Sequence, residues 1–365
     1  METGIAGMIT IAGYHRLPDL LAVRQFRPRQ HHLILTPRTH RLRDFLIEQS
    51  RPFCQYIELI EIDAFKPFQI YRVCSRIAQQ YAPGELILNL AGGTKPLMLL
   101  AYEACREYNH RVLFYDPFKR AFTVLSPEVH PLRVSFRLDM SETLQMLGYR
   151  LVEHRPEEEN SRFRMWALRI GREVRDYFRL MSELHNFFRR NPQAPLDAFR
   201  PPWQPTVYEL ELLEELKLWA NEHPMERIRR FAAGGWLLDY IYWAVRPHLE
   251  ETVADAVLEH VDWQTTYRIP ILGLRHHTLY SFWYVMTSNP MDVRDWLVEI
   301  RKWTKTVGQG ISKNYLFTPL DPYQHKQLLF MARRMHIFLM SMLELSQIHR
   351  VLRFQPFMGS EEAEV

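Results

Sequence analysis

The chain has 365 residues, of which 47% are hydrophobic and 24% are charged, with a formal net charge of +4. This composition excludes a disordered chain and predicts a globular protein long enough for two domains. No run approaches the roughly 18 apolar residues of a membrane span, and the first residues lack a secretory-signal pattern, so we expect a cytoplasmic protein without a membrane partner. The three cysteines, Cys54, Cys74 and Cys105, predict buried thiols and no disulfide framework.

Short apolar runs alternate with helical patterns through the first part of the chain. We expect strands at residues 8–12, 32–36, 56–63, 86–90 and 112–115. Helices are expected near residues 17–22, 41–49 and 68–81, and from Pro96 onward. This alternation predicts an α/β fold with a parallel, doubly wound sheet, in which ligands bind at the carboxyl ends of the strands.

The segment Glu85–Pro117 contains the most informative of these strand ends. The strand at 86–90 leads into Ala91-Gly-Gly-Thr-Lys95, and Pro96 then opens a helix. Two glycines allow close approach of the backbone, and the free N–H groups of a first helical turn add to the charge of Lys95. The pattern predicts an anion-binding site, with a purely structural turn as the alternative.

Two further loops with basic residues follow predicted strands, at Gly13–Arg16 and Thr36–His40. Since the three strand ends share one edge, we expect a broad positive surface suited to a ligand with several phosphates. The loops match neither the Gly-x-Gly-x-x-Gly fingerprint nor the Walker A pattern, which argues against NAD and against ATP hydrolysis.

Two motifs resemble a known family. The segments Ile9-Thr-Ile-Ala-Gly13 with Pro18-Asp-Leu-Leu21, and Asn89-Leu-Ala-Gly-Gly-Thr-Lys-Pro96, resemble the CARF domain (CRISPR-associated Rossmann fold). More narrowly, they are similar to the CARF–nuclease effectors of type III CRISPR defence. The resemblance covers about the first 125 residues and implies a dimer that binds cyclic oligoadenylate, usually the tetramer cA4, across its two-fold axis.

Carried onto this chain, the resemblance implies ligand contacts from all three loops, with Tyr14 placed to stack on an adenine. The predicted ligand-binding residues are Gly13, Tyr14, His15, Arg16, Thr36, Arg38, Ala91, Gly92, Gly93, Thr94 and Lys95.

The middle of the chain is predicted to be mainly helical. A strand-like run from Ser126 is followed by a helix at Ser141–Leu147 and an acidic break at 157–160. A long helix is predicted over Arg162–Arg190, and its arginine face is suited to nucleic acid, to an acidic partner or simply to solvent. A proline-rich linker over Pro192–Pro205 and a helix over Val207–Glu222 follow.

The remaining sequence resembles the nuclease domain of the same effectors. The carriers are Ala233-Gly-Gly-Trp-Leu-Leu-Asp-Tyr-Ile-Tyr242 and Ile300–Gly310. The family's PD-(D/E)xK centre needs an Asp on one strand and Glu-x-Lys on the next, to hold Mg²⁺ or Mn²⁺ and to activate water. Here the strands read Arg268–Leu274 and Thr278–Thr287, and they contain no carboxylate and no Glu-x-Lys. The resemblance therefore implies a degenerate nuclease.

Scattered polar residues are the only substitutes for that centre. Asp239 and Glu299 are the remaining catalytic candidates, and Asp262 and the pair His276-His277 lack metal-ligand spacing, the pair being predicted as a polar turn. We expect no metal or other cofactor, with Mg²⁺ or Mn²⁺ needed only if the nuclease is active. A last strand is expected at Tyr315–Thr318 and a long helix over Gln324–Arg350.

These patterns predict four regions. Residues 1–130 form a CARF-like domain, 131–230 a helical linker region, 231–355 a restriction-endonuclease-like domain, and 356–365 a loose tail. The predicted function is sensing of cyclic oligoadenylate, with cA4 as the expected ring and the signal passed through the impaired nuclease-like domain to a partner. Candidate partners are a second copy in a homodimer, a related CARF effector in a heterodimer, and nucleic acid. The alternatives are an activated metal-dependent DNA or RNA nuclease, and a ring nuclease that cleaves its ligand without metal using Lys95 and Thr94.

Overall fold

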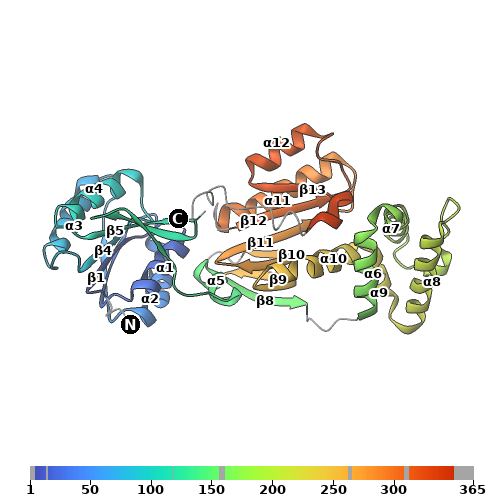
Figure 1. Cartoon of the computed structure of the whole chain (residues 1–365), viewed down its shortest axis with the longest axis horizontal. Coiled ribbons are helices and arrows are strands. Elements are labelled where there is room, and N and C mark those ends of the chain that lie inside the picture. Colours follow the sequence, from blue (N-terminus) through green and yellow to red (C-terminus); the bar gives the residue numbers. More distant parts are fainter. Residues whose placement is uncertain are drawn as a thin grey trace, which may run out of the picture. The chain divides into compact units, whose positions relative to one another are not determined.

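The computed structural model describes residues 5–13, 15–117, 119–155, 161–261, 265–307 and 312–348. The chain divides into two compact units, each built on its own sheet (Figure 1). Unit 1 comprises Met1–Arg150 with His260–Gln264, and unit 2 comprises Leu151–Glu259 with Thr265–Val365. Within the described ranges, no helix is long and apolar enough to cross a membrane.

Unit 1 contains a seven-stranded sheet in the order β3-β2-β1-β4-β5-β6-β7. Its strands are β1 (Gly7–Ile11), β2 (Gln30–Leu35), β3 (Tyr56–Glu61), β4 (Leu86–Asn89), β5 (Arg111–Asp116), β6 (Ala121–Ser126) and β7 (His130–Arg133). The five neighbouring strands β3, β2, β1, β4 and β5 pair in parallel. Strands β5, β6 and β7 pair antiparallel. The strand order reverses between β1 and β4, and ligands of open parallel sheets bind at such a reversal.

Helices cover both faces of this sheet (Figure 1). They are α1 (Arg16–Phe26), α2 (Arg43–Ser50), α3 (Pro67–Ala78), α4 (Lys95–Arg106) and α5 (Met140–Met146). Helices α3 and α4 share one core with β-strand residues such as Ile9 and Leu88, while α1 packs against α2 and α5. Cys74 and Cys105 are buried free thiols in the α3–α4 core, as predicted, and Cys54 is half-buried.

The five predicted strands are present, each within two residues of its expected ends. They were identifiable because both faces of a central parallel strand are buried, which leaves an uninterrupted apolar run such as β1. The strand-like run predicted from Ser126 onward contains strand β7, which is mostly exposed. Strand β6 was not predicted.

Unit 2 contains a six-stranded sheet in the order β13-β12-β11-β10-β9-β8. Its strands are β8 (Tyr149–Arg155), β9 (Glu251–His260), β10 (Thr266–Arg275), β11 (Thr278–Tyr284), β12 (Ser312–Thr318) and β13 (Ile337–Ser341). Strands β9, β10 and β11 pair antiparallel, and β11, β12 and β13 pair in parallel. The predicted α/β class is confirmed, with a parallel-rich sheet in the first part of the chain and a second sheet in the last part.

The helices of unit 2 flank this sheet and extend beyond it. They are α6 (Ser161–Arg172), α7 (Val174–Arg190), α8 (Val207–Glu222), α9 (Met225–Arg230), α10 (Trp236–Val245), α11 (Pro290–Val307) and α12 (Lys326–Arg334). The helix predicted over Arg162–Arg190 is two helices, because Glu173 leaves the helical conformation at φ −112° and ψ 38°. The break lets the apolar sides of α6 and α7 reach one core.

The long helix predicted over Gln324–Arg350 is wrong. Helix α12 ends at Arg334, His336 has a left-handed φ of 57°, and Ile337–Ser341 then forms strand β13 beside β12. A methionine- and leucine-rich segment suits a helix on its own, but pairing with a buried neighbouring strand decides the conformation here.

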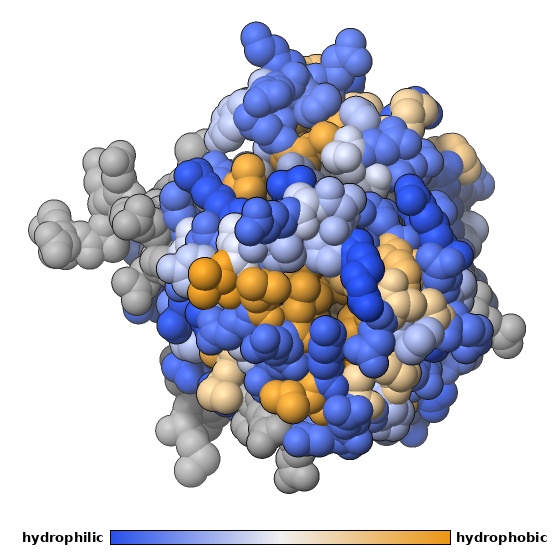
Figure 2. Space-filling view, turned by 90° about the vertical axis from the view of Figure 1, so that its right-hand side faces the viewer, coloured by the Kyte–Doolittle hydropathy of each residue, from blue (hydrophilic) through white to orange (hydrophobic). Residues whose placement is uncertain are grey.

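One core joins the helices α6–α8 and α10 to the sheet of unit 2, and Tyr177, Trp219, Trp236 and Phe282 are among its buried members. The helices of the predicted linker region thus pack in the same core as the sheet of unit 2. Figure 2 looks onto the end of unit 2 that carries α7 and α8, where apolar side chains gather on the surface. Exposed members of α8 are Val207, Leu210 and Leu218.

Candidate ligand-binding site

The predicted site residues of unit 1 lie in three loops at the carboxyl ends of β1, β2 and β4, and we call this surface the ligand edge. Strand β1 pairs with β2 on one side and with β4 on the other, so the loops that follow them are neighbours. The ligand edge comprises Gly13, His15, Thr36, Arg38 and Ala91–Lys95. Tyr14 lies outside the described residues.

Glycines bring the loop after β1 into backbone contact with the loop after β4. A Cβ atom on Gly92 would lie 2.1 Å from the Ile11 carbonyl oxygen and 2.5 Å from the Gly13 nitrogen. A Cβ atom on Gly13 would lie 2.9 Å from the Gly92 Cα atom, and Gly93 adopts a φ of +92° that disfavours other residues. That these glycines admit a ligand stays a prediction. The structure shows that they let the two loops touch.

Helix α4 begins directly in this loop. Thr94 is its N-cap, with extended backbone and no hydrogen bond from its side chain to the helix, and the Met98 N–H bonds to the Thr94 carbonyl at 3.0 Å. Gly93, Thr94 and Lys95 are all exposed. Positive charge from the helix dipole, from first-turn N–H groups and from the Lys95 ammonium therefore meets at an accessible surface.

The loop after β2 is folded on itself. The Thr36 N–H donates to the Thr39 hydroxyl at 3.0 Å, and both threonines are buried. Arg38 is exposed, and Nε2 of His40 lies 3.0 Å from a carboxylate oxygen of Glu61. A hollow of about 620 Å³ opens here, lined by Thr36, Pro37, His40, Glu61, Ile62 and Asp63. Its two carboxylates come from the end of β3 and were not predicted.

Arg16, like Thr36, is a predicted contact that the structure buries. Its side chain is only 4% exposed, and its guanidinium lies over the ring of Phe45, 4.4 Å from the ring centre. A Cβ atom on Gly148 would lie 2.4 Å from the Arg16 Nη1 atom. This arginine packs beneath the start of α1, against α2 and the loop after α5.

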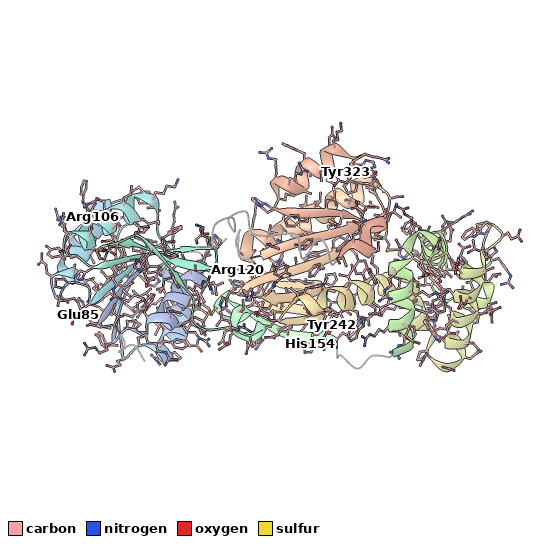
Figure 3. All side chains as sticks on the ribbon, in the orientation of Figure 1. Glu85, Arg106, Arg120, His154, Tyr242 and Tyr323 are labelled. Atoms are coloured by element: carbon pink, nitrogen blue, oxygen red, sulfur yellow. The ribbon has the colours of Figure 1, made fainter. Side chains whose placement is uncertain are left out.

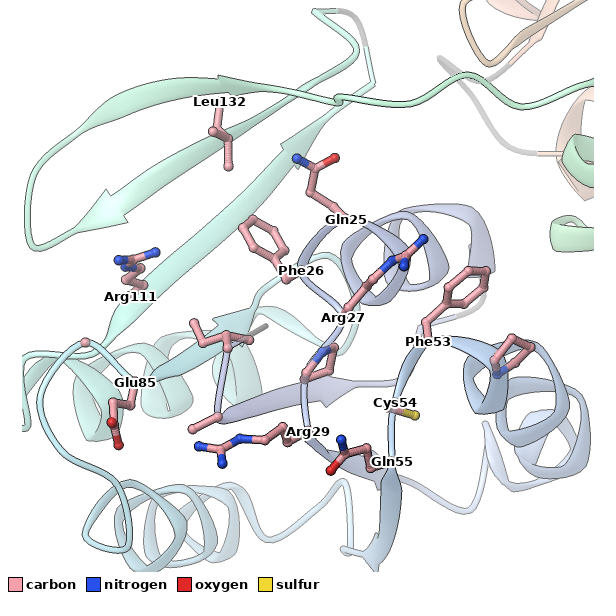
Figure 4. A pocket seen from close by; sticks show the side chains of 15 residues that line it. Gln25, Phe26, Arg27, Arg29, Phe53, Cys54, Gln55, Glu85, Arg111 and Leu132 are labelled. Atoms are coloured by element: carbon pink, nitrogen blue, oxygen red, sulfur yellow. The ribbon is translucent and has the colours of Figure 1, made fainter. Parts of the chain in front are cut away.

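A second hollow lies at the opposite edge of this sheet, at the amino ends of the strands (Figure 4). It has a volume of about 1020 Å³, and Arg27, Arg29, Arg111 and Glu85 are among its lining residues. Because the ligand edge is formed by the carboxyl ends of the same strands, this hollow is separate from it.

In unit 2, the predicted catalytic candidate Asp239 belongs to a group of two ion pairs. Arg155 of β8 pairs with Asp239 of α10, and Arg230 of α9 pairs with Asp255 of β9. Tyr284 of β11 interacts electrostatically with all four of these residues. Burial raises the pKa of Tyr284 to about 12. We call these five residues the Asp–Arg cluster.

Two unusual backbone conformations occur at the Asp–Arg cluster, one beside it and one at Asp255. Residues 231–235 make a π-helical turn in which Gly234 has a φ of 113°, and a Cβ atom there would lie 3.0 Å from the Tyr284 ring. Asp255 has a φ of 51°, and the pairing of β9 with β10 skips from Ala256–Ile269 to Ala254–Ile271 around it. Strained positions of this kind are concentrated at functional sites.

The charges within the cluster are balanced. The carboxyl group of Asp239 is largely buried, and burial raises its pKa, while the Arg155 guanidinium opposes that rise. A cavity of about 330 Å³ beside it is lined by Arg155, Phe163, Pro224, Glu226, Arg227, Arg230, Phe231, Gly235 and Asp239. Three arginines and two carboxylates, those of Glu226 and Asp239, thus line this cavity.

The other predicted catalytic candidate, Glu299, pairs with a lysine on the surface of α11. Glu299 is on α11, half exposed, with a carboxylate oxygen 2.6 Å from the Lys302 Nζ atom. In the part of the chain that the structure describes, no group of three His, Cys, Asp or Glu side chains could hold a metal ion. Asp262 lies outside the described residues.

The pair His276-His277 forms the two-residue turn between β10 and β11. Their φ values of 47° and 63° are both left-handed, and Arg275 pairs with Thr278 across the turn. The His276 N–H donates to Glu250 at 3.0 Å. The geometry is that of a tight hairpin turn with two positive φ values.

With this geometry established, sequence comparison identifies unit 1. Residues 8–143 match the protein-family model described as the Card1 CARF domain. The chain carries a CARF domain. The resemblance predicted from the glycine-rich motifs is therefore confirmed. No curated protein matches the chain in sequence.

Solved structures match the CARF domain together with unit 2. Can2 from Sulfobacillus thermosulfidooxidans, in complex with cyclic tetra-adenylate, shares 19% identity with a TM-score of 0.73 over 95% of this chain and 96% of its own. Protein VC1899 from Vibrio cholerae shares 16% identity with a TM-score of 0.74, over 95% and 97%. A type III CRISPR defence DNA nuclease activated by cyclic oligoadenylate shares 16% identity with a TM-score of 0.53 over 87% of this chain and 46% of its own. The chain has the fold of these proteins.

Sequence reasoning missed several residues that shape both sites. Beneath the ligand edge these are Asp19 and the side chain of Asn89, both inside the CARF motifs. In unit 2 they are Arg155, Arg230 and Asp255, which come from separate elements and carry no local pattern. Only the acidic residue in the Gly-Gly-Trp helix, Asp239, was identifiable from sequence.

Proposed function

We propose that this protein senses a cyclic oligoadenylate of type III CRISPR defence through its CARF domain. The observation that carries the proposal is the exposed Gly93-Thr94-Lys95 segment at the start of α4, at the strand-order reversal of a CARF domain. Can2, which has the same fold over nearly its whole length, was solved with cyclic tetra-adenylate. That ring is the first ligand to test.

The chemistry of the ligand edge fits phosphodiesters. First-turn N–H groups of α4 and the Lys95 ammonium supply donors and positive charge to phosphate oxygens. Arg38 adds a second exposed cation from the loop after β2. The hollow beside it offers the Glu61 and Asp63 carboxylates, which accept hydrogen bonds from the exocyclic amino group of an adenine.

A second copy of the chain completes the site in this proposal. Leu99 lies one turn after Lys95 on α4 and is 66% exposed, and Phe68 of the adjacent helix α3 is 71% exposed. Large apolar side chains in contact with water support an interface at this face. A two-fold axis beside α4 would bring two Lys95 side chains to one ring with four phosphates.

Unit 2 passes on the signal and does not cut nucleic acid in this proposal. The support is the Asp–Arg cluster, whose two carboxylates are each paired with an arginine, and the absence of carboxylates from β10 and β11. Divalent cations need several oxygen ligands, so two arginine-bound carboxylates make a poor metal site.

Calorimetry with cyclic tetra-adenylate tests the sensor proposal. We expect Lys95→Ala to weaken binding at least about tenfold, since one charge-assisted contact is lost. Arg106→Ala is the matched control, because Arg106 is an exposed cation at the other end of α4, paired with Glu103 (Figure 3). Absence of binding by the wild-type protein contradicts the proposal.

An incubation with Mn²⁺, cyclic tetra-adenylate and either plasmid or labelled RNA tests unit 2. Intact nucleic acid is the expected result. Cleavage that depends on the ring and is lost in Asp239→Ala would establish a nuclease. Chromatography of the ring from the same mixture distinguishes a sensor from a ring nuclease, for which exposed Thr94 and Lys95 are the candidate groups.

A further inference from the structure

A buried carboxylate lies directly beneath the ligand edge and links two of its loops. Asp19, in the first turn of α1, is 2% exposed. Its Oδ2 atom accepts a hydrogen bond from the Gly13 N–H at 3.3 Å, and its Oδ1 atom accepts one from the Asn89 side-chain amide at 3.4 Å. The Asn89 Oδ1 atom in turn accepts from the Ala91 N–H at 3.2 Å.

We propose that Asp19 is a positioning residue for the ligand, holding the loops after β1 and β4 as one rigid surface through Asn89. The inference rests on the proposed function, because the two loops are the proposed phosphate-binding surface. Asp19 itself is buried and acts through the Gly13 and Ala91 backbone.

The polarity of this chain of hydrogen bonds requires a carboxylate at one position. Both ends of the chain are backbone N–H groups, which only donate. Asn89 can accept from Ala91 and donate to Asp19, and Asp19 must then accept from both sides. An ionised carboxylate satisfies every donor, whereas a neutral amide at residue 19 leaves two donors facing each other at one link.

The environment of Asp19 indicates that its charge is costly to keep. Burial raises the pKa of Asp19 to about 7, and the Gly13 N–H lowers it in part. A neutral side chain would avoid the desolvation of a buried charge. Asp19 can therefore accept from both donors as an ionised carboxylate mainly above pH 7, and this is the pH range in which the binding of variants is best compared.

The glycine contacts make the two loops mechanically dependent. Gly13 and Gly92 touch through their backbones, so a displacement of either loop moves the other. Asp19 fixes the first loop at Gly13, and Asn89 fixes the second at Ala91, one residue before Gly92. The spacing of Gly13 from Lys95 is thereby set before any ligand arrives.

Exchanging the two side chains tests the polarity argument. The variants are Asp19→Asn, Asn89→Asp and the double variant D19N/N89D, with Asp44→Asn as the control, since the Asp44 side chain is 99% exposed in the same domain. In the double variant, the amide at 19 accepts from Gly13 and donates to the carboxylate at 89, which also accepts from Ala91. All donors are again satisfied.

We expect each single variant to bind cyclic tetra-adenylate about tenfold more weakly than the wild type, and the double variant to recover to within about threefold. Asp44→Asn should bind like the wild type. Single variants that bind as tightly as the wild type overturn the proposal, as does a double variant no better than the weaker single one. A residue that merely fills space would show no such recovery.

Amide hydrogen exchange without ligand provides a second reading. Asn89→Asp should speed exchange at Gly13, a residue that Asn89 does not contact, and the double variant should restore protection. Unchanged Gly13 exchange overturns the coupling even if a single variant folds too poorly for calorimetry. Because this measurement uses no ligand, failure of the proposed function (no binding by the wild type) is distinguishable from failure of the positioning role.

Discussion

The ligand edge of the CARF domain and the Asp–Arg cluster of unit 2 treat charge in opposite ways. At the ligand edge, Lys95 and the start of α4 present positive charge on an exposed surface. The carboxylate that links the two loops through hydrogen bonds, Asp19, is buried below this surface. In the cluster, Asp239 and Asp255 are each neutralised by an arginine.

The ligand edge thus exposes positive charge to solvent, whereas the charges of the Asp–Arg cluster are paired with each other. Positive charge at a rigid helix start costs no rearrangement when a phosphate binds. A cluster of paired charges would have to break an ion pair before it could bind a metal or a phosphate, which makes it a stable connection between elements of unit 2.

Gly92→Ala should break the ligand edge most severely. The new Cβ atom would meet the Ile11 carbonyl oxygen at 2.1 Å and Gly13 behind it, so the backbone must shift. We expect a loss of about 3 kcal/mol or more in the free energy of unfolding of the CARF domain, and loss of ligand binding. Gly84→Ala, with φ +82° but open space around it, should cost only about 1 kcal/mol. Equal losses in thermal unfolding would contradict this picture.

Arg155→Met should reveal the opposite character of the cluster. It leaves the largely buried Asp239 carboxylate without its partner, and we expect a loss of about 2 kcal/mol in the stability of unit 2, with ligand affinity unchanged. Denaturation followed by tryptophan fluorescence measures it, because Trp219, Trp236 and Trp303 are buried in unit 2.

The double variant R155M/D239L is the control for Arg155→Met. Removing both charges should return most of the lost stability, since no unpaired carboxylate is left behind. A double variant as unstable as the single one would show that packing of the arginine, and not charge balance, matters at this position.

The pH dependence of stability should reflect Asp19. Between its ordinary value of 3.8 and its raised pKa of about 7, the folded protein holds a proton that the unfolded chain releases, so this residue makes stability fall as pH rises. Buried His31, whose pKa is lowered to about 3, acts in the opposite direction below about pH 6.5. The difference between wild type and Asp19→Asn, measured from pH 4 to 7, should therefore have the slope of Asp19 alone. An identical profile for the two proteins argues against the raised pKa.

Mn²⁺ should have the smallest effect of all. Ligands stabilise a fold only by binding it, and the arginine-paired carboxylates leave few oxygens for a cation. We expect millimolar Mn²⁺ to shift the unfolding temperature by less than about 1 °C. A larger rise that disappears in Asp239→Asn would instead support a metal centre in unit 2.

The sequence predicted the CARF domain well because its information is local. Central parallel strands are buried on both faces and read as apolar runs, and the glycine turn with Lys95 and Pro96 lies in consecutive residues. The element that was predicted wrongly depends on a distant partner. Strand β13 forms because β12 lies beside it, although its own sequence suits a helix.

The candidate sites divide in the same way. The three loops with basic residues were correctly expected at one edge of the sheet, but Thr36 is folded into its own turn and Arg16 packs against Phe45. The partners of Asp239 and Asp19 could not be predicted, because Arg155 lies 84 residues from Asp239 and Asn89 lies 70 residues from Asp19. Such contacts exist only in the folded chain.

The stoichiometry of ring binding tests the central claim most directly. Calorimetric titration of the wild-type protein with cyclic tetra-adenylate, beside linear tetra-adenylate of the same length, reports both affinity and the number of ligands per chain. We expect tight binding of the ring at one ring per two chains. The linear form should bind more weakly, because it must lose more conformational freedom. No binding of the ring, or one ring per chain with no preference for the cyclic form, would contradict it.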